Sequence, residues 1–255
     1  MRKLLILLAF GGLLISCSSG VDTATMTADE HYAYAKSLYD DEDYLDAITE
    51  FQAILLQYPG SKINDDAQFY LGMSYYNEEQ YILAAYEFSK LIREIPASPY
   101  VSEAQFMLAN SYYELSPDYR LDQTYTEKAI KEFQAYIDFF PTSPKVKEAE
   151  QKIDELHNKL AHKEFATAVL YEKMDYYFAA IEYFTSVIDN YYDTEYAPQA
   201  LLKRIEVHLR LHDKENAKKD IKTFLNRYPD RKDELEKVKD LIKKNFPNEE
   251  FNENY

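Results

Sequence analysis

The chain has 255 residues, among them 45 acidic and 29 basic side chains, and its formal net charge at pH 7 is −16. A charge of this sign and size disfavours nucleic acid as a partner, because phosphate backbones are bound by basic surfaces. The chain contains one cysteine, which excludes an internal disulfide. Tyrosine (25) and phenylalanine (14) are abundant and glycine (5) is rare, as expected for packed helices.

The first residues have the pattern of a secretion signal. Arg2 and Lys3 precede an apolar run over residues 4–15, which is short for a membrane-spanning helix. Residues 14–17, Leu-Ile-Ser-Cys, resemble the bacterial lipoprotein box, in which the signal is removed and the cysteine carries lipid. The resemblance implies a signal peptide over 1–16 and a membrane anchor at Cys17. Residues 17–27 are small and polar and are predicted to form a flexible tether.

Two predicted helices and a proline stop form a unit that recurs along the chain. In the unit over 66–96, apolar residues follow helical spacing in both segments, and Pro96 ends the second. Small or apolar residues of the first helices recur in steps of 37, 37, 59 and 37: Ala35, Gly72, Ala109, Ala168 and Ile205. The long step of 59 contains eight extra residues near 116–123. It also contains fourteen residues that lengthen the first helix of the fourth repeat, which is predicted as one helix over 145–171. The predicted repeats cover 28–61, 62–98, 99–143, 144–194 and 195–230, a cap helix covers 231–245 and an acidic tail covers 246–255.

The repeats resemble the tetratricopeptide repeat. The second copy carries that motif most fully, with Leu71-Gly72, Tyr75, Ala84, Phe88 and Pro96 at the expected offsets. The resemblance implies an all-α fold: a right-handed α-solenoid of about five helix pairs plus a C-terminal capping helix. Solenoid repeats are scaffolds, so the pattern is more informative about fold than about function.

The same resemblance implies that the fifth, ninth and twelfth residues of each first helix face a concave groove. Aromatic residues dominate these positions in the first three copies, which suits an extended or helical peptide with aromatic anchors. The alternative is that the rings pack on neighbouring helices. The groove candidates are Tyr32, Lys36, Tyr39, Phe69, Met73, Tyr76, Phe106, Asn110 and Tyr113.

The C-terminal part has the opposite charge to the rest of the chain. Residues 201–244 carry 14 basic and 9 acidic side chains. They form either a solvated, lysine-rich helix face or a docking surface for an acidic partner, in which complementary charge would speed association. The docking candidates are Lys203, Arg204, Arg210, Lys218, Lys219 and Arg227.

The sequence offers little support for catalysis, and we predict a non-enzymatic protein without cofactor or metal. His208 and His212 have a metal-capable spacing on a predicted helix, but no third ligand is evident and His208 falls on a core position. The paired carboxylates lie at helix starts or turns, where they satisfy the helix dipole and water. No glycine-rich phosphate loop is present.

Taken together, the lipoprotein box, the short tether and the five repeats resemble the BamD family of outer-membrane assembly lipoproteins. That resemblance implies N-terminal repeats that receive unfolded outer-membrane proteins and C-terminal repeats that dock the periplasmic domains of a BamA-like barrel subunit. It also implies a lipid-anchored protein of the outer membrane with its body in the periplasm. The alternatives are a Tol-Pal-associated repeat adaptor, although no N-terminal coiled coil is visible, and a glycan-capturing lipoprotein, although the chain has no tryptophan.

Overall fold

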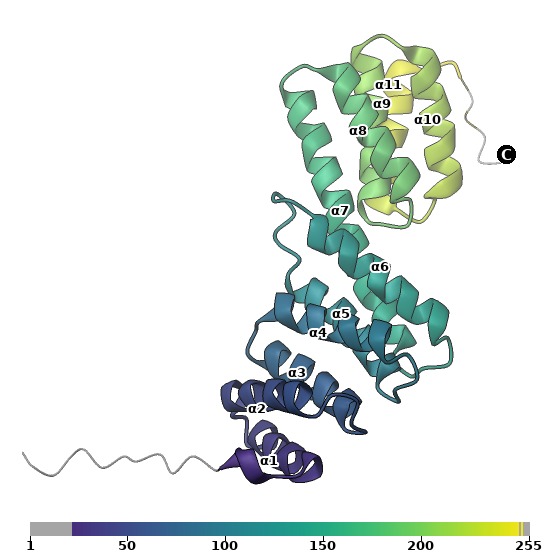
Figure 1. The fold of residues 1–255 in the computed structure, drawn as a ribbon. Helices are drawn as coiled ribbons and strands as arrows, with labels where there is room; N and C mark the ends of the chain where they lie inside the picture. The colour runs from purple at the N-terminus through teal and green to yellow at the C-terminus, as the bar shows by residue number, and fades with distance from the viewer. Residues whose placement is uncertain (1–21, 250, 252–255) are drawn as a thin grey trace, which may run out of the picture.

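The computed structural model describes residues 22–249 and residue 251, and every α-helix in that part of the chain belongs to one linear array (Figure 1). Cys17 and the predicted signal peptide lie outside the described residues. The helices are α1 (Ala28–Asp40), α2 (Tyr44–Gln57), α3 (Asn64–Asn77), α4 (Tyr81–Glu94), α5 (Val101–Glu114), α6 (Thr124–Phe139), α7 (Val146–Lys173), α8 (Tyr177–Asn190), α9 (Tyr196–Arg210), α10 (Lys214–Arg227) and α11 (Lys232–Asn245).

Consecutive helices pack as hairpins, and the hairpins stack along the chain. Each helix from α1 to α10 packs on its successor, and first helices of neighbouring hairpins also touch, as in α1 with α3 and α7 with α9. The last helix, α11, packs on α9 and α10 at the C-terminal end. This arrangement confirms the predicted all-α solenoid of five helix pairs and a capping helix.

Four of the hairpins share one turn, in which a non-glycine residue adopts a left-handed conformation. These residues are Glu42, Glu79, Asp175 and His212, with φ between 57° and 63°. In each turn, the N–H of the residue after the left-handed one donates to the carbonyl five residues earlier, in the last turn of the preceding helix. For example, Gln80 N donates to the Tyr75 carbonyl at 2.9 Å. This is the Schellman pattern that satisfies the last carbonyls of a helix. These four turns therefore end the first helices through backbone hydrogen bonds.

Each hairpin is held together by the small and aromatic residues that defined the repeat. Ala84 and Phe88 of α4 are fully buried. A Cβ placed on Gly72 would lie 2.7 Å from Phe88 Cε1, so only glycine allows α3 to approach this ring so closely. Equivalent pairs are fully buried in the other hairpins: Ala47 with Phe51, Ala129 with Phe133, Ala180 with Phe184, and Ala217 with Ile221.

A polar tie joins the two helices of four hairpins, at the position three residues after the buried alanine of the second helix. Gln105 Nε2 donates to Glu132 Oε2 at 3.0 Å, and His31 Nε2 lies 2.6 Å from Glu50 Oε2. Gln68 likewise bonds Glu87, and Arg204 bonds Asp220. Because most of these groups are buried, each hydrogen bond prevents the cost of an unpaired polar atom and fixes the register of the two helices.

The core is divided into two clusters that meet along α7. The N-terminal cluster runs from Ala35 to Leu156 and the C-terminal cluster from Ala168 to Phe246. The 28-residue α7, predicted as one long helix over 145–171, contributes to both. Figure 1 shows α7 joining the lower group of helices to the upper group. We call the middle of α7, where the groups meet, the waist.

Both ends of the described chain are tied to the solenoid. Within the predicted tether, residues 23–25 form a 3-10 turn, and the Tyr58 hydroxyl donates to the Met26 carbonyl at 2.8 Å. Thr27 caps α1 through a reciprocal pair with Glu30. Within the predicted acidic tail, Phe246 is buried in the C-terminal cluster. Each of the two segments is therefore attached to the helices by at least one residue, Met26 at one end and Phe246 at the other.

Candidate functional site

The predicted inner wall of the N-terminal repeats comes from α1, α3 and α5, and the structure corrects three of its candidates. The solvent-exposed fraction is only 6% for Phe69, 3% for Phe106 and 7% for Asn110. The Phe69 ring stacks on Tyr100 at a centroid distance of 4.5 Å. The Phe106 ring packs edge-on against Tyr136 at 5.2 Å. These three side chains therefore pack inside the helix array and do not line a groove. Helix spacing predicts which face of a helix a side chain occupies, but not whether side chains of neighbouring helices cover it.

The other six candidates are partly exposed, and we call them the groove residues: Tyr32, Lys36, Tyr39, Met73, Tyr76 and Tyr113. Several are held in place by contacts between first helices. The Asn77 amide donates to the Tyr39 hydroxyl at 3.2 Å, and the Tyr39 and Tyr70 rings meet edge-on at 5.1 Å. Lys36 Nζ lies 4.7 Å from the centre of the Tyr70 ring, within the range of a cation–π contact.

The wall continues onto α7 through Tyr113. Its hydroxyl donates to Glu155 Oε2 at 2.6 Å, and Lys152 Nζ lies 4.0 Å from the ring centre. The bond to Glu155, followed by partial burial, raises the pKa of Tyr113 to about 12. Burial is the main cause of the raised pKa values of Tyr39 and Tyr76. These phenols therefore stay neutral at physiological pH and present an uncharged, amphipathic surface.

Sequence spacing did not identify the residue at the centre of the aromatic cluster. Tyr70 contacts Tyr32, Tyr39, Phe51, Phe69 and Tyr100. It follows Phe69 directly, so the repeat alignment places it one residue away from the wall positions. The only signal in the sequence was the density of tyrosine on the first helices.

Four of the six docking candidates already have partners within the chain. Arg204 donates through Nε and Nη2 to Asp220 at 2.8 and 2.7 Å, and through Nη1 to Thr185 at 2.8 Å. Lys203 and Arg210 both approach Glu172, at 3.6 and 3.2 Å. Lys218 pairs with Glu249 at 2.8 Å. Arg204 is therefore a structural residue, since its side chain and that of Asp220 are largely buried.

The remaining two candidates, Lys219 and Arg227, lie exposed on α10. Arg227 lines a cavity of about 400 Å³ with Ile188, Asp189, Tyr192 and Tyr228, between the ends of α8 and α10. An arginine beside two tyrosines is a common composition of protein-binding hot spots. Of the six docking candidates, Lys219 and Arg227 are therefore the two that are open to a partner.

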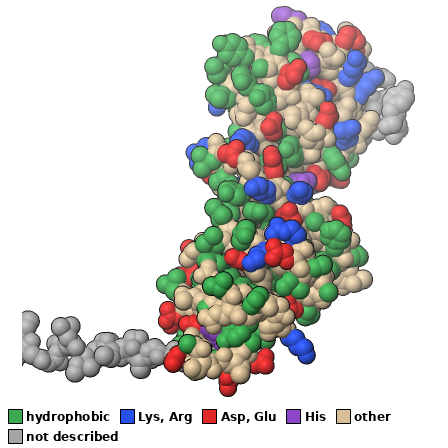
Figure 2. Space-filling model, in the orientation of Figure 1, with side chains coloured by type: hydrophobic (Ala, Val, Ile, Leu, Met, Phe, Trp, Pro, Cys, Tyr) green, Lys and Arg blue, Asp and Glu red, His purple; other side chains and the backbone are tan. Residues whose placement is uncertain are grey.

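An exposed apolar patch lies at the turn between α7 and α8, and the sequence analysis did not identify it. Leu170, Met174, Tyr176 and Phe178 are all more than half exposed, and Phe178 reaches 78%. Figure 2 shows hydrophobic side chains gathered on this edge of the C-terminal half. Arg210 borders the patch through its pair with Glu172. We call these four residues the apolar turn; clustered exposed side chains of this kind are typical of interaction surfaces.

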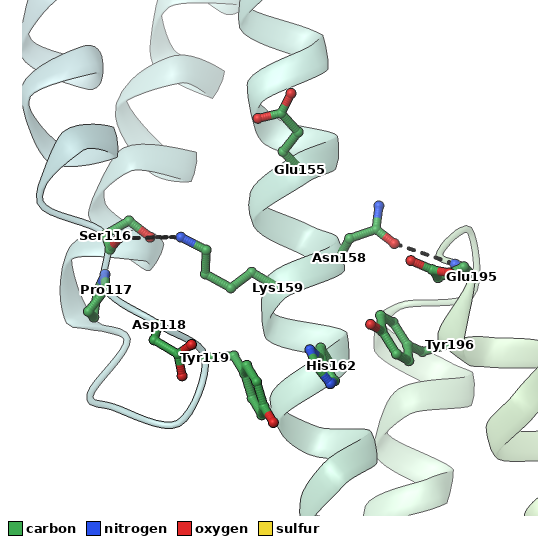
Figure 3. Close-up of a pocket in the computed structure, with 10 residues that line it drawn as sticks. All are labelled: Ser116, Pro117, Asp118, Tyr119, Glu155, Asn158, Lys159, His162, Glu195 and Tyr196. Atoms are coloured by element: carbon green, nitrogen blue, oxygen red, sulfur yellow. Dashed lines mark hydrogen bonds between the residues drawn. The ribbon is translucent and has the colours of Figure 1, made fainter.

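A cavity of about 390 Å³ opens at the waist, where the eight-residue insertion between α5 and α6 meets α7 and the start of α9 (Figure 3). We call it the waist pocket. It is lined by Ser116, Pro117, Asp118, Tyr119, Glu155, Asn158, Lys159, His162, Glu195 and Tyr196. The insertion was predicted from spacing, but its contact with α9 was not.

An aromatic stack forms the base of the waist pocket. The His162 ring lies between those of Tyr119 and Tyr196, with centroid distances of 3.8 and 4.9 Å. Lys159 Nζ points away to Ser116, with Oγ at 2.7 Å, and burial lowers the pKa of this ammonium group. Figure 3 shows the three rings side by side with Lys159 directed toward the loop.

Two further observations concern metals and membranes. Within residues 22–249 and 251, no group of three or more histidine, cysteine, aspartate or glutamate side chains is arranged to hold a metal ion. His208 lies buried between α9 and α10, as its core position predicted, and burial lowers its pKa. None of the helices in the described part of the chain combines the length and apolarity that crossing a membrane requires.

The fold and these surfaces define a helical-repeat scaffold that offers several separate faces to other molecules. A family model described as YfiO, outer membrane lipoprotein, matches residues 24–224, which is most of the described chain. The chain belongs to this family. The resemblance seen in the sequence is thereby confirmed.

Two curated relatives carry the name outer membrane protein assembly factor BamD. The Rickettsia prowazekii protein is 31% identical over 228 residues, covering 89% of this chain and 91% of the relative. The Caulobacter vibrioides protein is 32% identical over 103 residues, covering 40% of this chain and 34% of the relative. Among solved structures, the TPR2AB-domain:pHSP90 complex of yeast Sti1 is similar with 16% identity and a TM-score of 0.42, covering 79% of this chain and 78% of that one.

Proposed function

We propose that this protein is a non-enzymatic scaffold lipoprotein of outer-membrane protein assembly. The observation that carries the proposal is similarity over 89% of this chain to a relative named as an assembly factor. The fold presents partly exposed aromatic residues at one end and an apolar turn at the other. The wall and the turn lie on different core clusters. One polypeptide can therefore hold two protein partners at the same time.

In this proposal Cys17 carries the lipid that ties the protein to the outer membrane, with its body in the periplasm. Several acyl chains on one residue give stable anchoring, whereas a single chain gives only marginal binding. The chain between Cys17 and the start of α1 at Ala28 is short. The N-terminal repeats therefore lie near the bilayer.

We expect metabolic labelling with palmitate to mark the wild-type protein and not a Cys17→Ala variant, because Cys17 is the sole thiol in the chain. The measurement is labelled lipid per protein after immunoprecipitation. A Ser18→Ala variant is the matched control and should label normally. Equal labelling of the Cys17→Ala protein would contradict the anchor.

The groove residues are proposed to receive unfolded outer-membrane proteins. They offer neutral phenols, the thioether of Met73 and one ammonium group at Lys36 along three successive first helices. Such a surface binds aromatic side chains of an extended or helical segment with little demand for one sequence, since stacking and methionine contacts adapt to different rings.

The C-terminal repeats are proposed to dock the periplasmic domains of a BamA-like barrel subunit. Arg204 is excluded from direct contact by its pairing with Asp220 and Thr185. The apolar turn offers the contact area, while Arg227 and Lys219 offer charge at a second point. Exposed cations of this kind mainly raise the association rate and fix the orientation of the partner.

Affinity purification from detergent-solubilised envelopes tests the division between the two ends. A Tyr39→Ser, Tyr76→Ser variant should bind the unfolded barrel protein at least about ten-fold more weakly than wild type, because each lost aromatic contact is worth about 1 kcal/mol. It should retain the barrel subunit. A Lys219→Glu, Arg227→Glu variant should retain the client and lose the subunit, most strongly at low salt.

The matched controls change the same residue types elsewhere. Tyr86→Ser alters an exposed tyrosine on α4, and Lys131→Glu with Lys147→Glu reverses exposed charges on α6 and α7. Both should behave as wild type. Recovery of Tol components or of an outer-membrane transporter, in place of a barrel subunit, would contradict the proposed function.

A further inference from the structure

We propose that the outer face of α4 lies against the surface of a phospholipid bilayer. This contact rests on the proposed function, since it presupposes the lipid anchor at Cys17 and adds a second, non-covalent membrane contact to it. We call Ile82, Leu83 and Tyr86 the α4 patch. Ile82 and Tyr86 are more than half exposed, and Leu83 is 42% exposed. Detergent removes the bilayer, so Tyr86→Ser stays neutral in the affinity purification described above.

The α4 patch and two basic residues share one face of the helix. At 3.6 residues per turn, Tyr86 lies about one turn after Ile82 on the same side. Lys90 and Arg93 continue that side over the next two turns, and the Arg93 side chain is 64% exposed. Aliphatic and tyrosine side chains beside lysine and arginine are typical of helices that lie in a membrane interface. There the apolar groups enter the boundary region while the long cationic side chains reach phosphate groups.

This face carries little negative charge, although the chain as a whole has a formal net charge of −16. The carboxylates of α4 are those of Glu87 and Glu94. Glu87 is buried and accepts a hydrogen bond from Gln68. Glu94 pairs with Arg93 at 3.0 Å at the end of the helix. The phosphate groups of a bilayer would therefore meet less repulsion here than at the acidic turn over 40–43.

The point where the lipid joins the chain lies close to α4. The Tyr58 hydroxyl holds the Met26 carbonyl, so the segment that leads to the anchor is attached at the end of α2. Five peptide units separate Cys17 from Asp22, and they span at most about 18 Å. α4 belongs to the next hairpin, and packed neighbouring helices lie about 10 Å apart. Figure 1 shows α1 to α4 grouped at one end of the array.

This proximity distinguishes the α4 patch from the apolar turn. Phe178 has the same repeat position in α8 as Ile82 has in α4, two residues before the buried alanine. Phe178 belongs to the C-terminal half, beyond the 28 residues of α7. In the first hairpin this position is occupied by Leu45, which is also more than half exposed. Exposed apolar side chains at this position therefore continue from α4 toward the anchored end of the array.

The test couples the purified protein, residues 17–255, to phosphatidylcholine vesicles through a maleimide lipid that reacts with Cys17, the sole thiol. The chain has no tryptophan, so an Ile82→Trp variant reports from α4 alone. We expect coupling to shift its emission to shorter wavelength and to reduce its quenching by iodide several-fold. Brominated phospholipid should quench it. Adding Lys90→Glu and Arg93→Glu should restore much of the iodide quenching, because carboxylates then face the phosphate groups.

Phe178→Trp is the matched control, because Phe178 is more exposed than Ile82 at the same repeat position. Its emission and iodide quenching should not change on coupling. The coupling is chemical, so its result is independent of lipidation in cells, which the palmitate labelling tests separately. Equal iodide quenching of the free and the coupled Ile82→Trp protein would overturn the proposal and leave the α4 patch to a protein partner. An equal response of the Ile82→Trp and Phe178→Trp proteins would also overturn it, since the membrane contact would not be specific to α4.

Discussion

Replacing Arg204 by alanine is expected to lower the free energy of unfolding by about 3 kcal/mol, which is typical of breaking a buried ion pair from one side. Arg204 makes three hydrogen bonds, two to Asp220 and one to Thr185. Its removal leaves the Asp220 carboxylate buried between α9 and α10 with its strongest partner gone. The measurement is urea unfolding followed by far-UV circular dichroism.

The controls distinguish the lost pair from the lost charge. Arg227→Ala removes the same side chain from an exposed position on α10 and should change stability by less than about 0.5 kcal/mol. A double variant, Arg204→Met with Asp220→Leu, should recover most of the loss because neither charge is then left unpaired. An equal loss in Arg204→Ala and Arg227→Ala would show that the ion pair does not stabilise the C-terminal cluster.

Replacing Phe88 by alanine is expected to cost about 3–5 kcal/mol, the range for deleting a buried phenylalanine ring. Phe88 is fully buried in the N-terminal cluster, directly over Gly72. Because Gly72 has no side chain, this residue cannot fill the space that the ring leaves. The cavity therefore persists, and its cost adds to the lost hydrophobic burial. Urea unfolding measures this loss.

Phe139→Ala is the matched control, because Phe139 lies at the end of α6 and is 75% exposed. Its replacement should change stability by less than about 0.5 kcal/mol. Phe88 and Arg204 belong to different core clusters, so the two variants should also destabilise different halves. Hydrogen exchange would show this as faster amide exchange in α1–α6 for Phe88→Ala. Uniform acceleration along the whole chain would contradict two separable clusters.

The repeat spacing predicted the helices well because it reflects packing that recurs in every hairpin. The alanine and aromatic residues that set the register, such as Ala84 and Phe88, are the residues that the structure buries completely. The predicted cap helix over 231–245 corresponds to α11, Lys232–Asn245. Local periodicity and a close helix–helix approach are both properties that a sequence carries directly.

The candidate sites were less accessible to sequence reasoning, because exposure depends on neighbours that are distant in the chain. Phe69 was predicted on the groove, but Tyr100 from the next hairpin covers it. Arg204 was predicted on a docking surface, but Asp220 on the following helix binds it. The Tyr119, His162 and Tyr196 stack joins three separate segments. No spacing rule relates these residues.

The continuity of α7 determines how the two halves can move. Its 28 residues include neither glycine nor proline, so the helix has no residue at which it would readily bend. At 1.5 Å per residue it forms a rod of about 42 Å. Tilting such a rod by about 5° displaces its far end by roughly 4 Å, by simple trigonometry on that helix rise. A movement that a partner imposes on one half would therefore displace the other half through α7, without any unfolding of that helix.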